Sequence, residues 1–184
     1  AAATQSQALS AVMFLYKTVL KTDLPWLQNV VRATRPRRLP VVLTQAETRL
    51  VLGQLDGVPW LVASLLYGSG LRVLEALRLR VKDIDLKYQQ LTVRDGKGAK
   101  DRVTVLPAAL VQPLTTHLAR AQERHVLAIE RGFGGVKLPF ALLRKYPRAE
   151  FDWAWQYVFP STSASVDPRT GARRRHHLLE ANIQ

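Results

Sequence analysis

Apolar side chains recur at three- and four-residue spacing near the N-terminus, for example at Ala8, Val12, Leu15 and Val19. This period places them on one stripe and predicts an amphipathic helix. A second helix is predicted in the segment TDLPWLQNVV, with Asp23 as its N-cap and a proline near its first turn. The N-terminal region therefore indicates a small helical domain.

Two more helices are predicted between residues 44 and 70. Thr44 and Glu47 have the spacing of a capping box, which predicts a helix that begins at Thr44 and ends near Gly53. The segment PWLVASLLYGSG is strongly apolar and predicts a buried helix that Gly68 and Gly70 terminate. The glycines therefore mark a turn directly before the next element.

A further helix is predicted after that turn, with an arginine at its N-terminal end. Its core stripe consists of Leu71, Leu74, Leu77 and Val81. Arg72 and Glu75 lie one turn apart on the flank of the stripe, at the N-terminal end. The helix dipole disfavours a cation at this end. The position of Arg72 is explained either by a bound anion or by an ion pair with Glu75 or another carboxylate.

The apolar period changes after Asp83. Leu91 and Val93 alternate with polar residues before DGKGAKD, and Val103 and Val105 alternate after it, which predicts a β-hairpin. Its glycine-rich turn projects Lys97 and, less directly, Lys100. The chain then returns to a helical pattern from residue 106 to residue 130, followed by the loop RGFGGVKLP.

The C-terminal part has a different character, because aromatic residues occupy alternate positions. Trp153, Trp155 and Tyr157 precede a polar loop and then the basic run RRRHH, which ends with His176 and His177. Alternate residues diverge on a strand, and on a helix they lie roughly 200° apart. In either conformation one tryptophan is expected to pack into a core and the other to face outward.

Composition and charge narrow the function. The 184 residues carry a formal net charge of +13, no cysteine and 47% apolar residues, and no apolar run is long enough to span a membrane. Such an excess of positive charge is typical of nucleic-acid-binding proteins. Disulfides and thiolate metal sites are excluded, and adjacent histidines without a carboxylate pattern do not indicate a metal site.

A basic, proline-containing segment separates the first helical region from the rest. The segment RATRPRRLP includes Arg35, Arg37 and Arg38. Because proline blocks helix continuation, this segment is predicted to be a linker. It is either a solvated connector or a strap along a phosphate backbone.

Arg72 and Lys97 are the candidate catalytic residues. Arginine binds phosphate bidentately, and a lysine on a nearby hairpin can act on the same phosphate as a charge or a proton donor. Taken singly, Arg72 could instead pair with a carboxylate, and Lys97 could be a solvated surface residue. The stretch GKGAKD does not satisfy the pattern of a nucleotide-binding P-loop.

The two stretches together strongly resemble the tyrosine recombinases, or phage-type integrases. GSGLRVLEALRLRVKDID is similar to the helix that supplies that family's first catalytic arginine, and RDGKGAKDRVTVLP is similar to the hairpin that supplies its catalytic lysine. Arg72 and Lys97 are the matching positions. The resemblance implies strand exchange through a 3′-phosphotyrosyl link, without a metal or nucleotide cofactor.

The stretches RRLPVVLT, RKYPRA, WAWQYVFPS, DPRTG and RRHH resemble the integron integrases, a subgroup with an insertion in the catalytic domain. By this resemblance, Trp155 and Pro168 enclose a base extruded from a folded single-stranded cassette site, attC. His176 and His177 contribute to the same recognition, and Arg175 beside them is predicted to contact DNA.

The family pattern is incomplete in this sequence. Its His-x-x-Arg pair and nucleophilic tyrosine follow the insertion, whereas the stretch HLAR, from His117 to Arg120, precedes it and is interpreted as part of an ordinary helix face. The five tyrosines lie outside the expected context. The chain is therefore interpreted as an internal piece of a longer protein, inactive by itself.

The prediction is thus a mainly α protein with a small β-sheet, an α+β tyrosine recombinase catalytic domain. Residues 1–37 are expected to end a helical core-binding domain, and residues 38–184 to begin the catalytic domain, with the insertion at about 140–177. The expected partners are duplex attachment sites and folded attC DNA, and no membrane partner is expected. The complete enzyme is expected to be a homotetramer on DNA in the bacterial cytoplasm. The alternatives are a DNA-binding module of this fold without catalysis and a basic RNA-associated protein.

Overall fold

The computed structural model describes residues 2–24, 41–94, 96, 100–139, 142–168 and 171–183. The chain divides into two compact units, Ala1–Leu43 and Thr44–Gln184. The predicted boundary between residues 37 and 38 lies outside the described residues. The linker arginines Arg35, Arg37 and Arg38 and most of the second predicted helix lie outside them as well.

The first unit contains α1 (Ala2–Phe14), which continues into a π-helical turn, Leu15–Val19. The predicted N-terminal helix is therefore confirmed. Its apolar stripe is not buried among the described residues, since Val12, Leu15 and Val19 are all exposed. The unit thus presents an apolar helix face.

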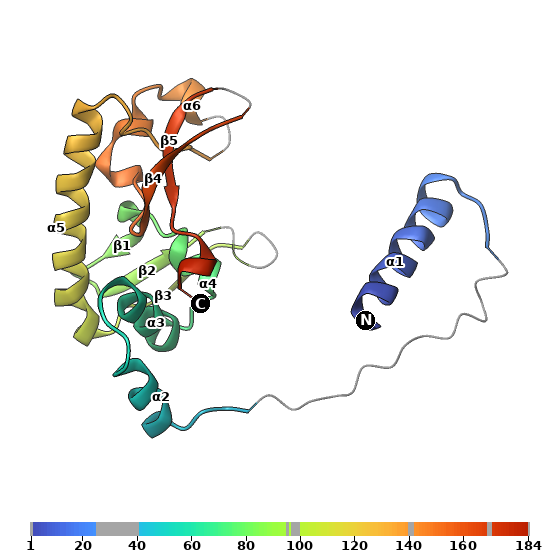
Figure 1. Cartoon of the computed structure of the whole chain (residues 1–184), viewed down its shortest axis with the longest axis horizontal. Helices are drawn as coiled ribbons and strands as arrows, with labels where there is room; N and C mark the ends of the chain where they lie inside the picture. Colours follow the sequence, from blue (N-terminus) through green and yellow to red (C-terminus); the bar gives the residue numbers. More distant parts are fainter. Residues whose placement is uncertain are drawn as a thin grey trace. The chain divides into compact units, whose positions relative to one another are not determined.

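The second unit combines helices with two small antiparallel sheets (Figure 1). Its helices are α2 (Gln45–Leu52), α3 (Gly57–Ser69), α4 (Val73–Leu77), α5 (Ala108–Glu130) and α6 (Leu142–Lys145). Its strands are β1 (Ile84–Asp85), β2 (Gln90–Val93), β3 (Arg102–Val105), β4 (Pro160–Val166) and β5 (Arg173–His177). Short 3-10 turns are Val81–Asp83, Ala149–Phe151, Trp153–Trp155 and Glu180–Asn182. This arrangement confirms the predicted α+β class.

Local signals in the sequence set the ends of α2 and α3. The capping box is confirmed, because the Thr44 backbone N–H donates to Glu47 at 2.8 Å and the Glu47 N–H donates to the Thr44 hydroxyl. Gly70 ends α3 in the left-handed region, with φ of 63°. Gly68, however, lies inside α3, and a Cβ there would meet the Pro107 ring at 2.5 Å. Gly68 therefore permits close packing and does not terminate the helix.

The helix after the glycine turn is shorter than predicted. The α4 helix has only five residues, and the chain then passes through a 3-10 turn, Val81–Asp83, into β1. Leu71 and Leu77 are buried as expected, whereas Leu74 is 36% exposed. A single helical turn presents a narrower buried face than the longer stripe would require. A helix this short also has little dipole, so an anion near Arg72 would depend on side chains.

The core of the second unit lies between α3, α4, α5 and the three-stranded sheet. Its buried members include Leu61, Val62, Leu65, Leu77, Leu91, Val93, Leu106, Leu110, Leu114, Val158 and Phe159. Val158 and Phe159 follow the aromatic segment and are almost fully buried in this same core. The C-terminal segment is thus part of the core of the unit. Among the described residues, none of the helices is long and apolar enough to cross a bilayer.

The predicted hairpin is confirmed as β2 and β3, in a sheet ordered β1–β2–β3 with Leu91 opposite Thr104. The faces of β3 differ from those of β2, because Val103 and Val105 are 60% and 57% exposed. The inward positions are polar: Thr104 donates to the Ser69 carbonyl at 2.8 Å, and Arg102 reaches α4. The alternation identified the strand correctly but not which face is buried.

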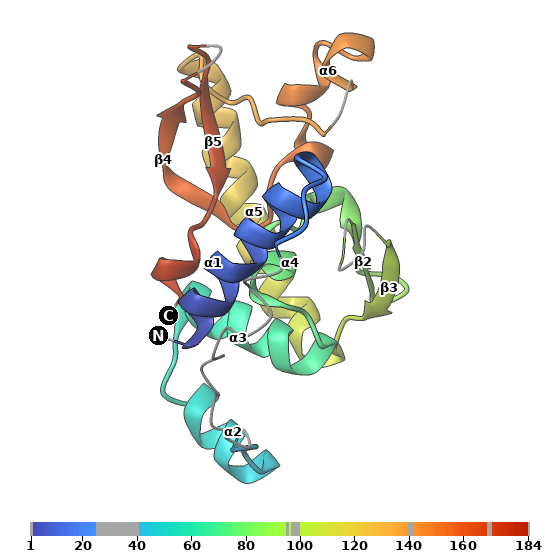
Figure 2. The ribbon, with the colours of Figure 1, turned by 90° about the vertical axis from the view of Figure 1, so that its right-hand side faces the viewer.

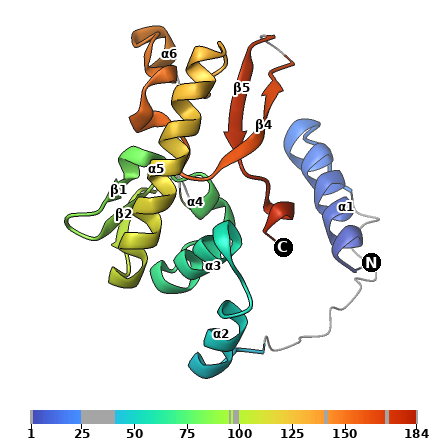
Figure 3. The same cartoon turned by 60° about the vertical axis from the view of Figure 1, so that its left-hand side comes forward.

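The predicted insertion segment, at about residues 140–177, contains α6, two 3-10 turns and the β4–β5 hairpin. Figures 2 and 3 show this hairpin beside the C-terminal half of α5. A small cavity between them is lined by Ala121 and His125 of α5 and by Arg175 of β5. The segment therefore packs directly on the long helix.

Candidate active site

One hollow in the second unit connects the two regions that the sequence marked for function. It has a volume of about 540 Å³ and is bordered by α4, the segment after it, β2, the hairpin turn and the aromatic segment. Its lining residues are Arg72, Leu74, Glu75, Arg78, Leu79, Arg80, Asp83, Thr92, Arg94, Gly96, Pro139, Trp155 and Tyr157. Arg72 and Trp155 therefore border a single space.

Arg72 is the N-cap residue of α4 and has an extended backbone. Its backbone N–H and its guanidinium both donate to the Glu75 carboxylate, each at 2.8 Å. The ion pair considered from the sequence is thus present. The Arg72 side chain is nevertheless 62% exposed and commits only one guanidinium nitrogen to this bond among the described residues. The remaining donors are available to a ligand.

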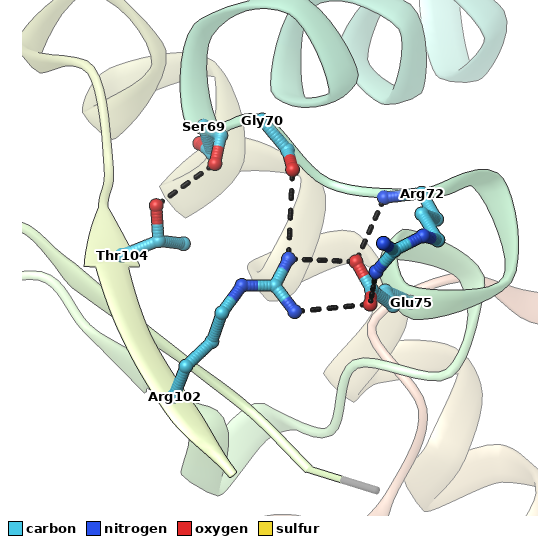
Figure 4. A network of polar contacts seen from close by, with 6 residues as sticks. All are labelled: Ser69, Gly70, Arg72, Glu75, Arg102 and Thr104. Carbon is cyan, nitrogen blue, oxygen red and sulfur yellow. Dashed lines mark hydrogen bonds and ion pairs between the residues drawn. The ribbon is translucent and has the colours of Figure 1, made fainter. Parts of the chain in front are cut away.

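Glu75 is held more firmly by Arg102 than by Arg72 (Figure 4). Arg102 donates two hydrogen bonds to the carboxylate, at 2.7 and 3.0 Å, in the fork geometry that favours both ions. The Arg102 hydrogen bond is the main reason that the pKa of Glu75 falls to about 2. Glu75 is therefore ionised at neutral pH, and it keeps a partner if Arg72 turns to a ligand.

The wall of the hollow is electropositive. Four of its lining residues are arginines and two are carboxylic acids, which leaves an excess of two positive charges. Arg94 donates to the buried Asp83 carboxylate at 2.7 Å, so one of these arginines is fixed by an acid. An excess of cations in a concave site favours an anionic ligand such as a phosphate.

The hairpin turn reaches the same hollow through Gly96. The Gly96 N–H donates to the Lys100 carbonyl, and a Cβ on Gly96 would lie 2.9 Å from that oxygen. Only glycine allows this approach of the two backbone segments. Lys97, the next residue in the sequence, lies outside the described residues, so its catalytic role stays a prediction.

Arg80 is a residue of the hollow that the sequence reasoning missed. Its guanidinium donates to the Trp155 carbonyl at 2.6 Å and to the Lys137 carbonyl at 2.9 Å, and it lies 4.6 Å from the centroid of the Tyr157 ring. Burial lowers the pKa of Arg80 from its ordinary value. Its signal in the sequence is a cation within the apolar run LRLRV, but its partners are more than fifty residues away.

The two tryptophans border different spaces, and both are half-buried. They lie in a 3-10 turn, and the Trp153 ring packs 5.7 Å from the His125 ring of α5 and borders the small internal cavity. The Trp155 ring instead borders the 540 Å³ hollow and a second one of about 840 Å³. Trp155 is contacted by Lys82 and Arg80, at 4.3 and 5.6 Å from its centroid.

The remaining predicted base-binding residues are on the β4–β5 hairpin. Pro168 is exposed in the turn, and His176 is exposed at the end of β5, 5.8 Å from the Tyr157 ring. His177 is only 7% exposed, packs edge-on against Tyr157 and lies 2.8 Å from the Leu178 carbonyl. The structure thus places both histidines against Tyr157, and among the described residues the ring contacts of Trp155 come from Arg80 and Lys82.

Arg175 and His117 are each partly buried beside an aromatic ring. Arg175 is half-buried near the Phe133 ring, and burial is the first cause of its lowered pKa. His117 lies on α5, 2.7 Å from the Val158 carbonyl and 5.1 Å from the Phe159 ring, and burial lowers its pKa as well. His117 therefore joins α5 to the C-terminal segment, as expected of an ordinary helix position.

Residues 44–174 match the phage integrase family, and the chain belongs to that family. The arginine at the start of α4 and the glycine-rich hairpin lie within the matched range. An integrase/recombinase of Escherichia coli and one of Pseudomonas aeruginosa are each 49% identical over 181 residues, which cover 98% of this chain and 54% of each relative. The chain thus spans about half the length of these relatives.

More distant relatives match a shorter region. The tyrosine recombinase XerA of Thermococcus kodakarensis is 39% identical over 99 residues, 52% of this chain and 35% of that protein. A crystal structure of XerA recombinase has 30% identity and a TM-score of 0.41 over 66% of this chain and 43% of that one.

Proposed function

We propose that this chain provides part of the DNA-phosphate site of a tyrosine recombinase and acts in site-specific DNA recombination. The observation that carries the proposal is the electropositive hollow, in which a largely exposed Arg72 stands beside a hairpin turn that enters through Gly96. Glu75 orients Arg72 and, because Arg102 also holds it, does not need Arg72 for its own charge. A scissile phosphate fits this arrangement of donors.

Arg72 would bind the non-bridging oxygens of the phosphate, and Lys97 would act as the general acid. A tyrosine oxygen attacks the phosphorus, the bond to the 5′-oxygen breaks, and the leaving oxygen takes a proton from Lys97. The product is a 3′-phosphotyrosyl link, which a 5′-hydroxyl reverses in the second step. Charge on the transferring phosphoryl group is stabilised by the arginine and the lysine, so the step requires no metal or nucleotide cofactor.

We further propose that the substrate is an integron cassette site, folded from single-stranded DNA with an extruded base. Support comes from Trp155, which exposes an aromatic surface to the same hollow as Arg72. Stacking on an aromatic ring suits an unpaired base. Pro168 and His176 are exposed on the hairpin and available to the base, whereas the buried His177 would act by supporting His176 and Tyr157.

The first unit is proposed to be the end of a helical core-binding domain, with Arg35, Arg37 and Arg38 lying along the phosphate backbone. The complete enzyme is proposed to act as a homotetramer on DNA, in the bacterial cytoplasm. These assignments follow from the family resemblance and from the net charge of +13.

The decisive experiment concerns Lys97 in a completed recombinase, meaning this chain joined to the remaining part of the 49% identical relative. Lys97→Ala should slow strand cleavage, and a 5′-phosphorothiolate substrate, whose sulfur leaves without a proton, should restore it. Lys100→Ala is the control and should cleave the ordinary substrate at the original rate. Lack of rescue by the sulfur substrate would exclude Lys97 as the general acid.

This chain by itself is proposed to bind DNA without cutting it. Tyr157 supports this view, since it is 8% exposed and its ring faces the Arg80 guanidinium. Incubation with a nicked suicide substrate should trap no covalent adduct. A trapped adduct would identify one of the five tyrosines as a nucleophile and overturn the proposal.

A further inference from the structure

The indole of Trp155 has a cation on its ring. The Lys82 ammonium lies over the ring, 4.3 Å from the centroid, and the Lys82 side chain is only 21% exposed. An ammonium at this distance is attracted to the electron-rich face of an indole, and more strongly when water is partly excluded. The contact joins the 3-10 turn after α4 to the aromatic segment.

Asp83 fixes the position of Lys82. The Asp83 side chain is 4% exposed and accepts hydrogen bonds from the Lys82 ammonium at 3.2 Å and from Arg94 at 2.7 Å. Its other oxygen accepts from the Arg80 backbone N–H at 3.2 Å. A buried carboxylate with three donors has little freedom to move, so Lys82 does not behave as a free surface lysine.

The backbone that follows the indole is fixed as well. Arg80 donates to the Trp155 carbonyl at 2.6 Å, and the Val81 N–H donates to the Gln156 carbonyl at 3.0 Å. The ring is therefore held by Lys82 while its own peptide is held by Arg80. This double restraint lowers the number of orientations the indole can adopt before a ligand arrives.

Lys82 contacts the Trp155 ring without lining either of the hollows that the ring borders. Trp155 borders both the 540 Å³ and the 840 Å³ hollow, and within the described part of the chain Lys82 lines neither of them. We propose that Lys82 is a positioning residue that occupies one face of the Trp155 ring and leaves a single face on which an unpaired nucleobase stacks. This inference rests on the proposed function of Trp155.

The test measures how much of the binding depends on the base. This chain is titrated with a folded DNA hairpin that carries one extruded purine, and with the same hairpin carrying an abasic sugar at that position. The ratio of the two affinities isolates the stacking contribution. Lys82→Met keeps the alkyl packing without the charge and should lower the ratio about three- to tenfold. Lys82→Arg keeps a cation on the ring and should preserve most of the affinity ratio.

A matched control is Lys87→Met, because the Lys87 ammonium lies 5.7 Å from the ring of the exposed Tyr88. It removes the same charge from another cation–ring pair and should leave the ratio unchanged. Melting temperatures of all variants establish that they are folded.

The outcomes separate the inference from the function on which it rests. If the affinity ratio falls to one in Trp155→Ala but stays unchanged in Lys82→Met, the role of Lys82 alone is overturned. Equal losses for the purine and abasic hairpins in Lys82→Met would make Lys82 an ordinary phosphate contact and overturn it too. A ratio of one in the unaltered chain would reject base stacking at Trp155 and, with it, the role of Lys82.

Discussion

Arg72 and Arg80 line the same hollow, but their surroundings assign them opposite tasks. Arg72 is 62% exposed and gives one guanidinium hydrogen bond to a carboxylate that Arg102 also holds. Arg80 is half-buried and donates to two backbone carbonyls, those of Trp155 and Lys137. The same residue type thus has a replaceable partner at one position and is fixed to backbone carbonyls at the other.

The difference lies in whether the partner can be exchanged. A phosphate can replace Glu75 as the partner of Arg72, because Glu75 remains paired with Arg102 and ionised. Nothing comparable replaces a guanidinium that donates to two backbone carbonyl groups at once, since an acceptor that loses its donor in a partly buried site is costly. Exposure and partner type therefore distinguish the two arginines better than the charge they share.

The largest effect is expected at the exchangeable arginine. In the completed recombinase, Arg72→Lys should lower the single-turnover cleavage rate by about a hundred- to a thousandfold, since lysine keeps the charge but loses the bidentate fork. DNA affinity should change little. Arg78→Lys, an exposed arginine of the same hollow, is the control and should cleave nearly normally. Comparable rate losses in both variants would mean that the hollow acts only by its total charge.

The comparison is sharpened by removing each guanidinium from this chain and measuring stability. Arg80→Met should lower the free energy of unfolding by about 2–4 kcal/mol, because two hydrogen bonds from a charged group are lost. Arg72→Met should lower it by less than about 1 kcal/mol, as expected for an exposed ion pair. Urea denaturation measures both, and similar losses would show that exposure does not separate the two roles.

Trp155 also borders the hollow that Arg72 and Arg80 line. In the completed recombinase, Trp155→Ala should weaken binding to a folded single-stranded site by about five- to a hundredfold, from the loss of one base stack worth roughly 1–3 kcal/mol. Duplex affinity should change little. His176→Ala should act in the same direction but less strongly. A large fall in melting temperature, or equal losses on both sites, would assign Trp155 to packing.

The smallest effect concerns how the free energy of unfolding depends on pH through Glu75, the carboxylate partner of Arg72. The pKa of Glu75 is lowered from 4.5 to about 2, so the unfolded chain takes up the proton at higher pH than the folded chain. The stabilisation is present above the unfolded value and is lost as the pH falls from 4.5 towards 2. Glu75→Gln should show a flatter loss of stability over that range. Parallel pH profiles for the two proteins would show that the ion pair contributes nothing.

The sequence predicted features that depend on near neighbours. The capping box of α2, the left-handed Gly70, the β2–β3 hairpin and the proximity of Arg72 to Glu75 all involve residues within a few positions of one another. These predictions hold because the interactions involved are short-range.

Other features depend on partners far along the chain. Arg80 donates hydrogen bonds to the carbonyl groups of Lys137 and Trp155, and no local sequence pattern indicates these partners. The inward face of β3 also depends on distant partners, because Arg102 and Thr104 form hydrogen bonds with α4 and with the end of α3, which the alternation of valines does not reveal. The α4 helix ended early because the chain turns to pair Arg80 with Tyr157.

That pairing has a consequence for how the molecule opens. The Val81 N–H donates to the Gln156 carbonyl, and the Val158 N–H donates to the Leu79 carbonyl. Leu79 and Val158 are themselves buried in the main core. The predicted insertion segment is thus joined near its middle to the chain that follows α4. Residues 156–158 therefore cannot detach as an independent foldon, and the amide protons of Val81 and Val158 should exchange with solvent only when the whole unit unfolds.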